Sequence, residues 1–173
     1  MEDFEESGVT DTGILHFAGP LDSTSNIPGV FSPGDILPGL RINGVTGTTM
    51  ATIGGNYTQG STNFGNTTKV VMVNSIPDGM RLDFNNYNVS AAGMDLMRAL
   101  TVGNVNVAVY GTNGILLGTT TKTIQFSETF VGVYSHQPIT RIDVLETTDV
   151  VFVDNIRFGS KFPWAMFLPA IKK

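Results

Sequence analysis

The aspartate at position 154 has the setting that most directly suggests chemistry. It lies in the stretch VVFVDNIRF, residues 150–158, whose apolar and β-branched composition predicts a strand. Because side chains alternate along a strand, one face is predicted to carry Asp154 together with Val150, Phe152, Ile156 and Phe158. A carboxylate in such a row needs a partner, since an unpaired buried carboxylate is costly or takes up a proton.

Aromatic side chains suggest a second kind of chemistry, the recognition of sugars. Aromatic rings stack on the apolar faces of sugars, while amide, carboxylate and guanidinium groups bond the hydroxyls. The predicted ligand-binding residues are Tyr57, Tyr87, Tyr110 and Tyr134, with Phe64 and Trp164 as further candidates. A place in the core or at its rim is the alternative for each tyrosine.

Catalytic patterns are poorly represented. The two histidines, His16 and His136, have no metal-ligand spacing, and no Gly-x-Ser-x-Gly nucleophile motif occurs. Four acids that a hydrolase could use are predicted instead to be solvated strand or turn residues: Asp83, Asp95, Asp143 and Glu146. We therefore expect a protein that is not an enzyme.

Composition limits the partners. The 173 residues carry a net charge of −5 and only 14% charged side chains, which argues against binding of a nucleic-acid backbone. No cysteine is present, so disulfides and thiolate metal sites are excluded. No apolar run is long enough for a membrane span. The acidic start is not a signal peptide, and we expect an extracellular or cell-surface chain whose leader has been removed.

Period-two alternation recurs along the chain and predicts the elements that must position these residues. Clear examples are residues 104–110 and 139–144, and residues 130–134 are apolar on both faces, which predicts a central strand. Residues 89–100 fit a strand better than a helix, and Thr112–Asn113–Gly114 predicts a hairpin turn. The sequence predicts an all-β fold, an antiparallel β-sandwich of the jelly-roll kind with little or no helix.

Residues 1–173 are predicted to form a single β-sandwich domain. Residues 19–47 are rich in Pro and Gly and predict a long ordered loop with one short strand near positions 40–42, and residues 52–68 predict an exposed loop. The apolar C-terminal tail, residues 161–173, contains two prolines and could dock on the sandwich or drive self-association.

Three stretches together resemble a known group of proteins. These are EDFEE at residues 2–6, FVGVYS followed by PITRI at residues 130–142, and VDNIRF at residues 153–158. They are similar to strands of jelly-roll carbohydrate-binding modules and of exported bacterial β-sandwich domains with surface-sorting signals, which are PEP-CTERM-like. The resemblance implies an extracellular jelly roll, often stabilised by calcium, that binds sugar or acts as a spacer.

The resemblance also suggests a partner for Asp154. In a jelly roll the first and last strands are neighbours, which would bring Asp3 and Glu5 near Asp154. Ca²⁺ accepts several hard oxygen ligands and would neutralise such a cluster. A structural Ca²⁺ on Glu5, Asp154 and Asp3 is therefore one hypothesis, and hydrogen bonds from backbone N–H groups or an arginine partner are the alternative.

Two functions remain open at this stage. The first is a non-catalytic extracellular binding module whose partner is a glycan. The second is a structural or adhesive cell-surface or matrix domain with no small-molecule ligand, which would associate through its edges or its tail.

Overall fold

The computed structural model describes residues 1–47, 49–59, 62–63, 66–74, 78–85, 88–146 and 148–160. Within this part of the chain the structure is antiparallel β, with a single 3-10 turn, η1 (Thr112–Gly114), as its helical element. The all-β prediction is confirmed. In these residues no helix has the length and apolar character needed to cross a membrane. Tyr87, Phe64, Trp164 and the tail 161–173 lie outside the described residues.

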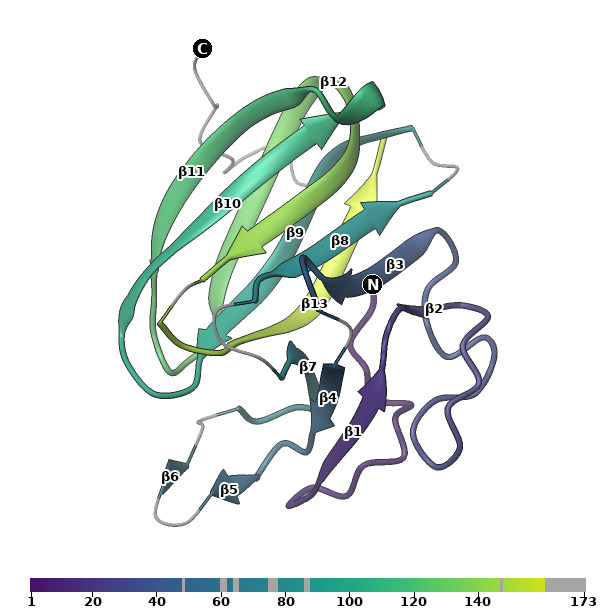
Figure 1. Ribbon diagram of the computed structural model, residues 1–173, viewed down its shortest axis with the longest axis vertical. Helices are drawn as coiled ribbons and strands as arrows, with labels where there is room; N and C mark the ends of the chain where they lie inside the picture. Colours follow the sequence, from purple (N-terminus) through teal and green to yellow (C-terminus); the bar gives the residue numbers. More distant parts are fainter. Residues whose placement is uncertain are drawn as a thin grey trace.

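The strands form a sandwich of two layers that are joined through one long strand (Figure 1). The layer named here the β8 layer has the order β11-β10-β12-β8-β3-β2, and the β9 layer has the order β1-β4-β7-β13-β9-β12. A separate two-stranded ribbon pairs β5 with β6. The strands are β1 (Ile14–Ala18), β2 (Leu21–Asp22), β3 (Leu40–Gly44), β4 (Thr49–Ile53), β5 (Thr58–Gln59), β6 (Thr62–Asn63), β7 (Val70–Val73), β8 (Met80–Phe84), β9 (Val89–Arg98), β10 (Gly103–Gly111), β11 (Leu116–Ile124), β12 (Thr129–Leu145) and β13 (Val151–Gly159).

Strand β12 belongs to both layers. Its residues 129–134 pair with β9, and residues 139–145 pair with β10 and β8. The register shifts between Tyr134 and Ile139, where Pro138 cannot donate a ladder hydrogen bond. Residues 130–134 were predicted to be central, and this is wrong: among the described strands they have a neighbour on one side only, and Phe130 and Tyr134 are exposed.

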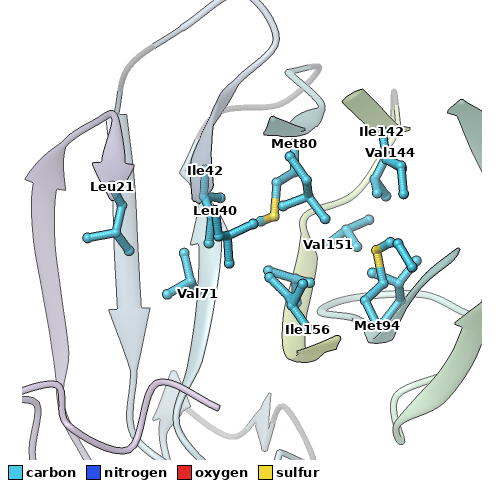
Figure 2. Close-up of a cluster of buried hydrophobic side chains, with 14 of the residues drawn as sticks. Leu21, Leu40, Ile42, Val71, Met80, Met94, Ile142, Val144, Val151 and Ile156 are labelled. Atoms are coloured by element: carbon cyan, nitrogen blue, oxygen red, sulfur yellow. The ribbon is translucent and has the colours of Figure 1, made fainter. Parts of the chain in front are cut away.

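The core lies between the two layers (Figure 2). The β8 layer contributes Ile42, Met80, Ile142 and Val144, while the β9 layer contributes Val71, Met94, Val151 and Ile156. This burial follows from the alternation seen in the sequence, because every second residue of each strand faces the other layer. A smaller cluster packs on the opposite, outer face of the β9 layer around Met97 and Phe152.

A bulge in β13 changes which residues share a face. The register with β9 shifts between Asp154 and Arg157, and Asn155 has a φ of 50°. Val151 and Val153 face the core before the bulge, and Ile156 faces it afterwards. The prediction that Ile156 and Phe158 share a face with Asp154 is therefore wrong, because the extra residue reverses the alternation.

The two ends of the described chain meet at β13. Glu2 and Ile156 exchange two backbone hydrogen bonds of 2.8 Å each. The expected neighbourhood of the opening and closing segments is thus observed, although it is an isolated bridge and not a strand. The Glu2 carboxylate accepts hydrogen bonds from the N–H groups of Leu37 (2.6 Å) and Phe4 (3.2 Å), and burial raises its pKa.

Two expected strands are confirmed, and one expected loop is wrong at its start. The short strand predicted near positions 40–42 is β3, and residues 89–98 form the strand predicted there. The loop predicted for residues 52–68 is wrong at its start, because Thr52 and Ile53 are buried in β4 between β1 and β7. The many Gly, Asn and Thr residues that follow predicted a loop, and the end of β4 was included in it.

Candidate binding face

The outer face of the β9 layer carries two exposed aromatic rings. Phe130 and Tyr134 lie on the same side of β12, and their residues are 47% and 43% exposed. They stand four residues apart, which is about 13 Å at about 3.3 Å per residue. Gly132 lies between them. We call these three residues the aromatic strip.

Small residues from β9 line the strip. In the β12–β9 register, Gly132 lies opposite Gly93 and Tyr134 lies opposite Ala91. The sheet has no side chains at this pair of glycines; Gly132 is half-buried, whereas Gly93 is buried. Sequence reasoning singled out Tyr134 but did not detect the glycine pair, which only the strand register reveals.

Charged groups flank the same surface. Asp95 lies opposite Phe130 in the register and is half-buried, and the exposed Arg157 of β13 lies opposite Gly93. A carboxylate and a guanidinium therefore border the glycine pair. Both groups can bond hydroxyls, the carboxylate as an acceptor and the guanidinium as a donor.

Contact with His136 holds the ring of Tyr134. The two rings meet edge to face with centroids 5.1 Å apart, and the Tyr134 hydroxyl lies 3.2 Å from His136 Nδ1. Such a contact limits the positions of an exposed side chain before any ligand arrives, which lowers the entropic cost of binding.

An apolar groove of about 290 Å³ opens on the same outer face, across β1, β4, β7 and β13. Its walls include Ile53, Met72, Ala99 and Phe152, which belong to the smaller hydrophobic cluster. Tyr57, His16 and Asn74 add polar atoms to its lining, and the Asn74 amide lies 3.2 Å from His16 Nδ1.

Asp154 is fully buried next to this face. Its carboxylate accepts hydrogen bonds from the Thr68 hydroxyl (2.5 Å) and from the N–H of Asn155 (2.7 Å). Burial raises the pKa of Asp154 to about 7; the two hydrogen bonds oppose this rise, and the charges of Glu128 and Asp3 add to it. The hydrogen-bonded alternative for Asp154 is therefore present in the structure.

The residues predicted for calcium do not assemble a donor set in the described part of the chain. Glu5 is exposed and accepts the N–H of Lys69 at 2.9 Å, while Asp3 accepts the N–H of Glu5 at 3.4 Å. No group of three acidic or histidine side chains there has the geometry of a metal site. Calcium binding stays a prediction of the sequence.

The four predicted tyrosines do not converge. Tyr134 belongs to the aromatic strip, and Tyr57 lines the apolar groove. Tyr110 lies on the outer face of the β8 layer, where the guanidinium of Arg141 stands 3.8 Å above its ring. Tyr87 is outside the described residues.

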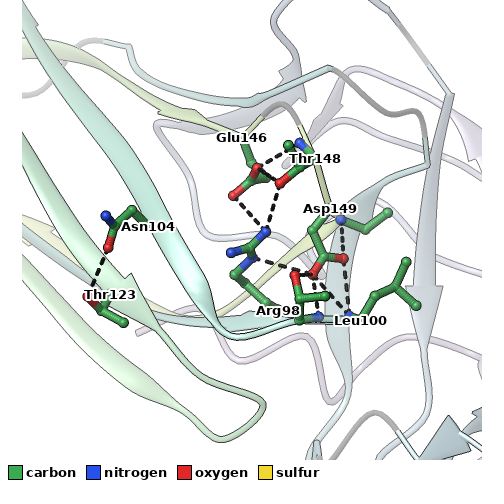
Figure 3. A network of polar contacts seen from close by, with 9 residues as sticks. Arg98, Leu100, Asn104, Thr123, Glu146, Thr148 and Asp149 are labelled. Carbon is green, nitrogen blue, oxygen red and sulfur yellow. Dashed lines mark hydrogen bonds and ion pairs between the residues drawn. The ribbon is translucent and has the colours of Figure 1, made fainter.

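A buried polar network was missed in the sequence (Figure 3). Arg98 forms ion pairs with Glu146 (3.2 Å) and Asp149 (3.3 Å), and all three side chains are buried. Asp143 is also buried, paired with Arg81 at 2.9 Å. The prediction that Asp143 and Glu146 are solvated is thus wrong, because strand alternation gives no sign of a cation brought from another strand.

No protein-family model and no curated protein matches this sequence. Among solved structures, it is similar to a point mutant of the family 29 carbohydrate-binding module CBM29-2, with 14% identity, a TM-score of 0.45 and coverage of 58% of this chain and 77% of that one. It is also similar to TmCBM61 in complex with β-1,4-galactotriose, with 12% identity, a TM-score of 0.43 and coverage of 70% and 88%. The family 11 carbohydrate-binding module from Clostridium thermocellum has 11% identity, a TM-score of 0.36 and coverage of 92% and 93%.

Proposed function

We propose that this protein is a non-catalytic carbohydrate-binding module that holds a glycan on the aromatic strip. The observation that carries the proposal is the pair of exposed rings, Phe130 and Tyr134, on one face of β12 with a glycine pair between them. Large exposed aromatic side chains are uncommon on a surface without a partner, and two on one strand face form a patch.

The spacing of the rings favours an oligosaccharide over a single sugar. A separation of about 13 Å exceeds the width of one pyranose ring, so each aromatic ring would stack on a different sugar of one chain. The chain would cross the half-buried Gly132, which has no side chain to obstruct it. Asp95 and Arg157 would bond hydroxyl groups of the sugars between the rings.

The same surface favours a neutral glycan over an acidic one. The protein has a net charge of −5, and Asp95 and Arg157 offset each other beside the strip. A polyanion would meet general repulsion at low ionic strength. An extracellular location suits this function, and it remains a prediction from composition.

A direct test is affinity electrophoresis of the purified chain in gels that contain soluble neutral polysaccharides, followed by calorimetry with oligosaccharides of the best one. We expect Phe130→Ala and Tyr134→Ala each to weaken binding about five- to thirtyfold, as expected for the loss of a stacking contact worth about 1–2 kcal/mol. The control variant is Leu116→Ala, which removes an equally exposed apolar side chain (53%) from β11 in the other layer.

Absence of retardation across the polysaccharides would contradict the proposal. So would retardation that Phe130→Ala and Tyr134→Ala leave unchanged. In the first case a structural or adhesive domain without a small-molecule ligand becomes the better account. Longer oligosaccharides should bind more tightly than single sugars, and equal affinity would exclude the two-ring arrangement.

A further inference from the structure

We propose that the apolar groove between β1, β7 and β13 is a second binding site, for an uncharged ring-sized ligand that carries a hydroxyl or carbonyl group. This site does not depend on the aromatic strip, and it differs from the strip in shape and chemistry. The strip is an exposed surface with charged neighbours, whereas the groove is a concave space with an apolar floor.

The charge of the lining restricts the ligand to uncharged compounds. None of the described residues that line the groove is Asp, Glu, Lys or Arg. An ionised ligand would lose hydration there without gaining a countercharge, and an anion would also face the net charge of −5. A neutral, largely apolar compound pays no such penalty.

The size of the groove restricts the ligand to about one ring. Its volume of about 290 Å³ corresponds to roughly ten water molecules at about 30 Å³ each. The walls are formed by Met72, Phe152 and Ile53, whose side chains are buried on the sheet and so are already in place. An aromatic ring with one short substituent fits such a space, and its burial against these side chains drives binding.

His16 and Asn74 give the groove a polar end. The Asn74 amide bonds His16 Nδ1 at 3.2 Å, and when Nδ1 accepts this hydrogen bond the proton of the neutral ring is on Nε2. The pair then offers an N–H donor at His16 and a carbonyl acceptor at Asn74. A hydroxyl or ester group on the ligand can bond this pair while the ring occupies the apolar part.

The test uses methyl 4-hydroxybenzoate as the neutral probe and 4-hydroxybenzoate, the anion of the same ring, as its charged counterpart. Titration of the ¹⁵N-labelled chain at pH 7.5 should shift the amide signals of Met72, Leu100 and Phe152 to saturation with the ester. The anion should bind at least tenfold more weakly. Equal binding of the two compounds, or ester shifts scattered away from the groove, would overturn the proposal.

Two variants locate the site. Ala99→Leu adds atoms to the wall of the groove and should abolish ester binding. His16→Ala removes an exposed rim group, which keeps the fold intact, and should weaken binding about threefold or more. The matched control is His136→Ala, the other exposed histidine, which lies on β12 and should leave ester affinity unchanged. Ester affinity unaltered by His16→Ala, or by a folded Ala99→Leu, would refute the site. Both variants should be retarded in polysaccharide gels as strongly as the natural protein, because the aromatic strip is unchanged in them.

Discussion

Two buried aspartates that lie five residues apart have carboxylates that are stabilised in different ways. Asp149 accepts hydrogen bonds from the N–H groups of Leu100, Thr101 and Val150 and forms an ion pair with Arg98. Asp154, by contrast, has the hydroxyl of Thr68 and the N–H of Asn155, and none of the ion pairs found in the described residues includes it. Both side chains are fully enclosed.

The difference shows two ways of accommodating a buried carboxylate. Around Asp149 the fold supplies a cation and several hydrogen-bond donors. Around Asp154 the fold supplies too few donors, and burial raises the pKa to about 7 so that a proton replaces the missing cation. The first arrangement depends on an arginine, and the second depends on pH.

Removal of the arginine should have the largest effect. Arg98→Met leaves Glu146 and Asp149 buried without their cation, and we expect a loss of about 3–5 kcal/mol in the free energy of unfolding. Guanidinium denaturation measures it. Arg157→Met is the control, because Arg157 is exposed, and it should change stability by less than about 0.5 kcal/mol. Equal losses for the two variants would show that the network contributes nothing specific.

Substitution of Asp154 should stabilise the protein, whereas substitution of Arg98 destabilises it. The gain in stability should depend on pH. The folded pKa of about 7 lies above the ordinary 3.8, so the unfolded state releases the proton first. Stability of the natural protein should therefore fall as pH rises from about 4 to about 7 and then level off, by at most about 4 kcal/mol. Asp154→Asn removes this dependence.

Denaturation of Asp154→Asn and the natural protein at pH 5 and pH 8 measures the effect. The free energy of unfolding of the variant, relative to that of the natural protein, should be larger at pH 8 than at pH 5. Asp11→Asn, at an exposed acid, is the control and should show no such change. A difference between variant and natural protein that is the same at both pH values would mean that Asp154 is already ionised at pH 5.

A smaller effect should come from Gly103, which makes room for Arg98. A Cβ at this position would overlap the guanidinium of Arg98. Gly103→Ala should cost about 1–3 kcal/mol by displacing the arginine. The double variant with Arg98→Met tests the cause, because the cost of the alanine should largely disappear when the guanidinium is absent. Additive losses would mean that the backbone at residue 103, and not Arg98, requires glycine.

Calcium removal should have the smallest effect if Asp154 is accommodated by protonation. The sequence-based hypothesis expects EDTA to lower the melting temperature by several degrees and added Ca²⁺ to restore it. The geometry around Glu5 and Asp3 gives no donor set for such a shift among the described residues. Melting curves with and without EDTA at pH 7.5 decide between the calcium hypothesis and a metal-free Asp154. An unchanged melting temperature would contradict the calcium hypothesis.

Much of the fold could be predicted because β alternation is a local signal. Residues 139–144 illustrate this: Ile142 and Val144 face the core, and Arg141 and Asp143 face outward, as their spacing indicates. The turn at Asn113 and Gly114 was equally local, and both residues have positive φ. The predictions were wrong where one inserted residue changed the register, as at Asn155. They were also wrong where the decisive contact joins residues that are far apart in the sequence.

The candidate sites show the same limit. Tyr134 could be selected from its type alone, but Phe130 was assigned to a central strand because its neighbours are apolar on both faces. Only the pairing of β12 with β9 leaves it exposed and places Gly132 opposite Gly93. The groove brings His16 and Asn74 together across 58 positions, and no pattern in the sequence indicates this.

The sequence by itself determined the antiparallel β architecture, the absence of disulfides and the acid at position 154 that needs a partner. Local alternation, composition and turn residues are enough for these, because each depends on a few neighbouring positions. The tertiary structure decided which acid receives a cation and which a proton, and which aromatic rings face solvent. These depend on strand register, and register is set by the packing of residues that are far apart in the chain.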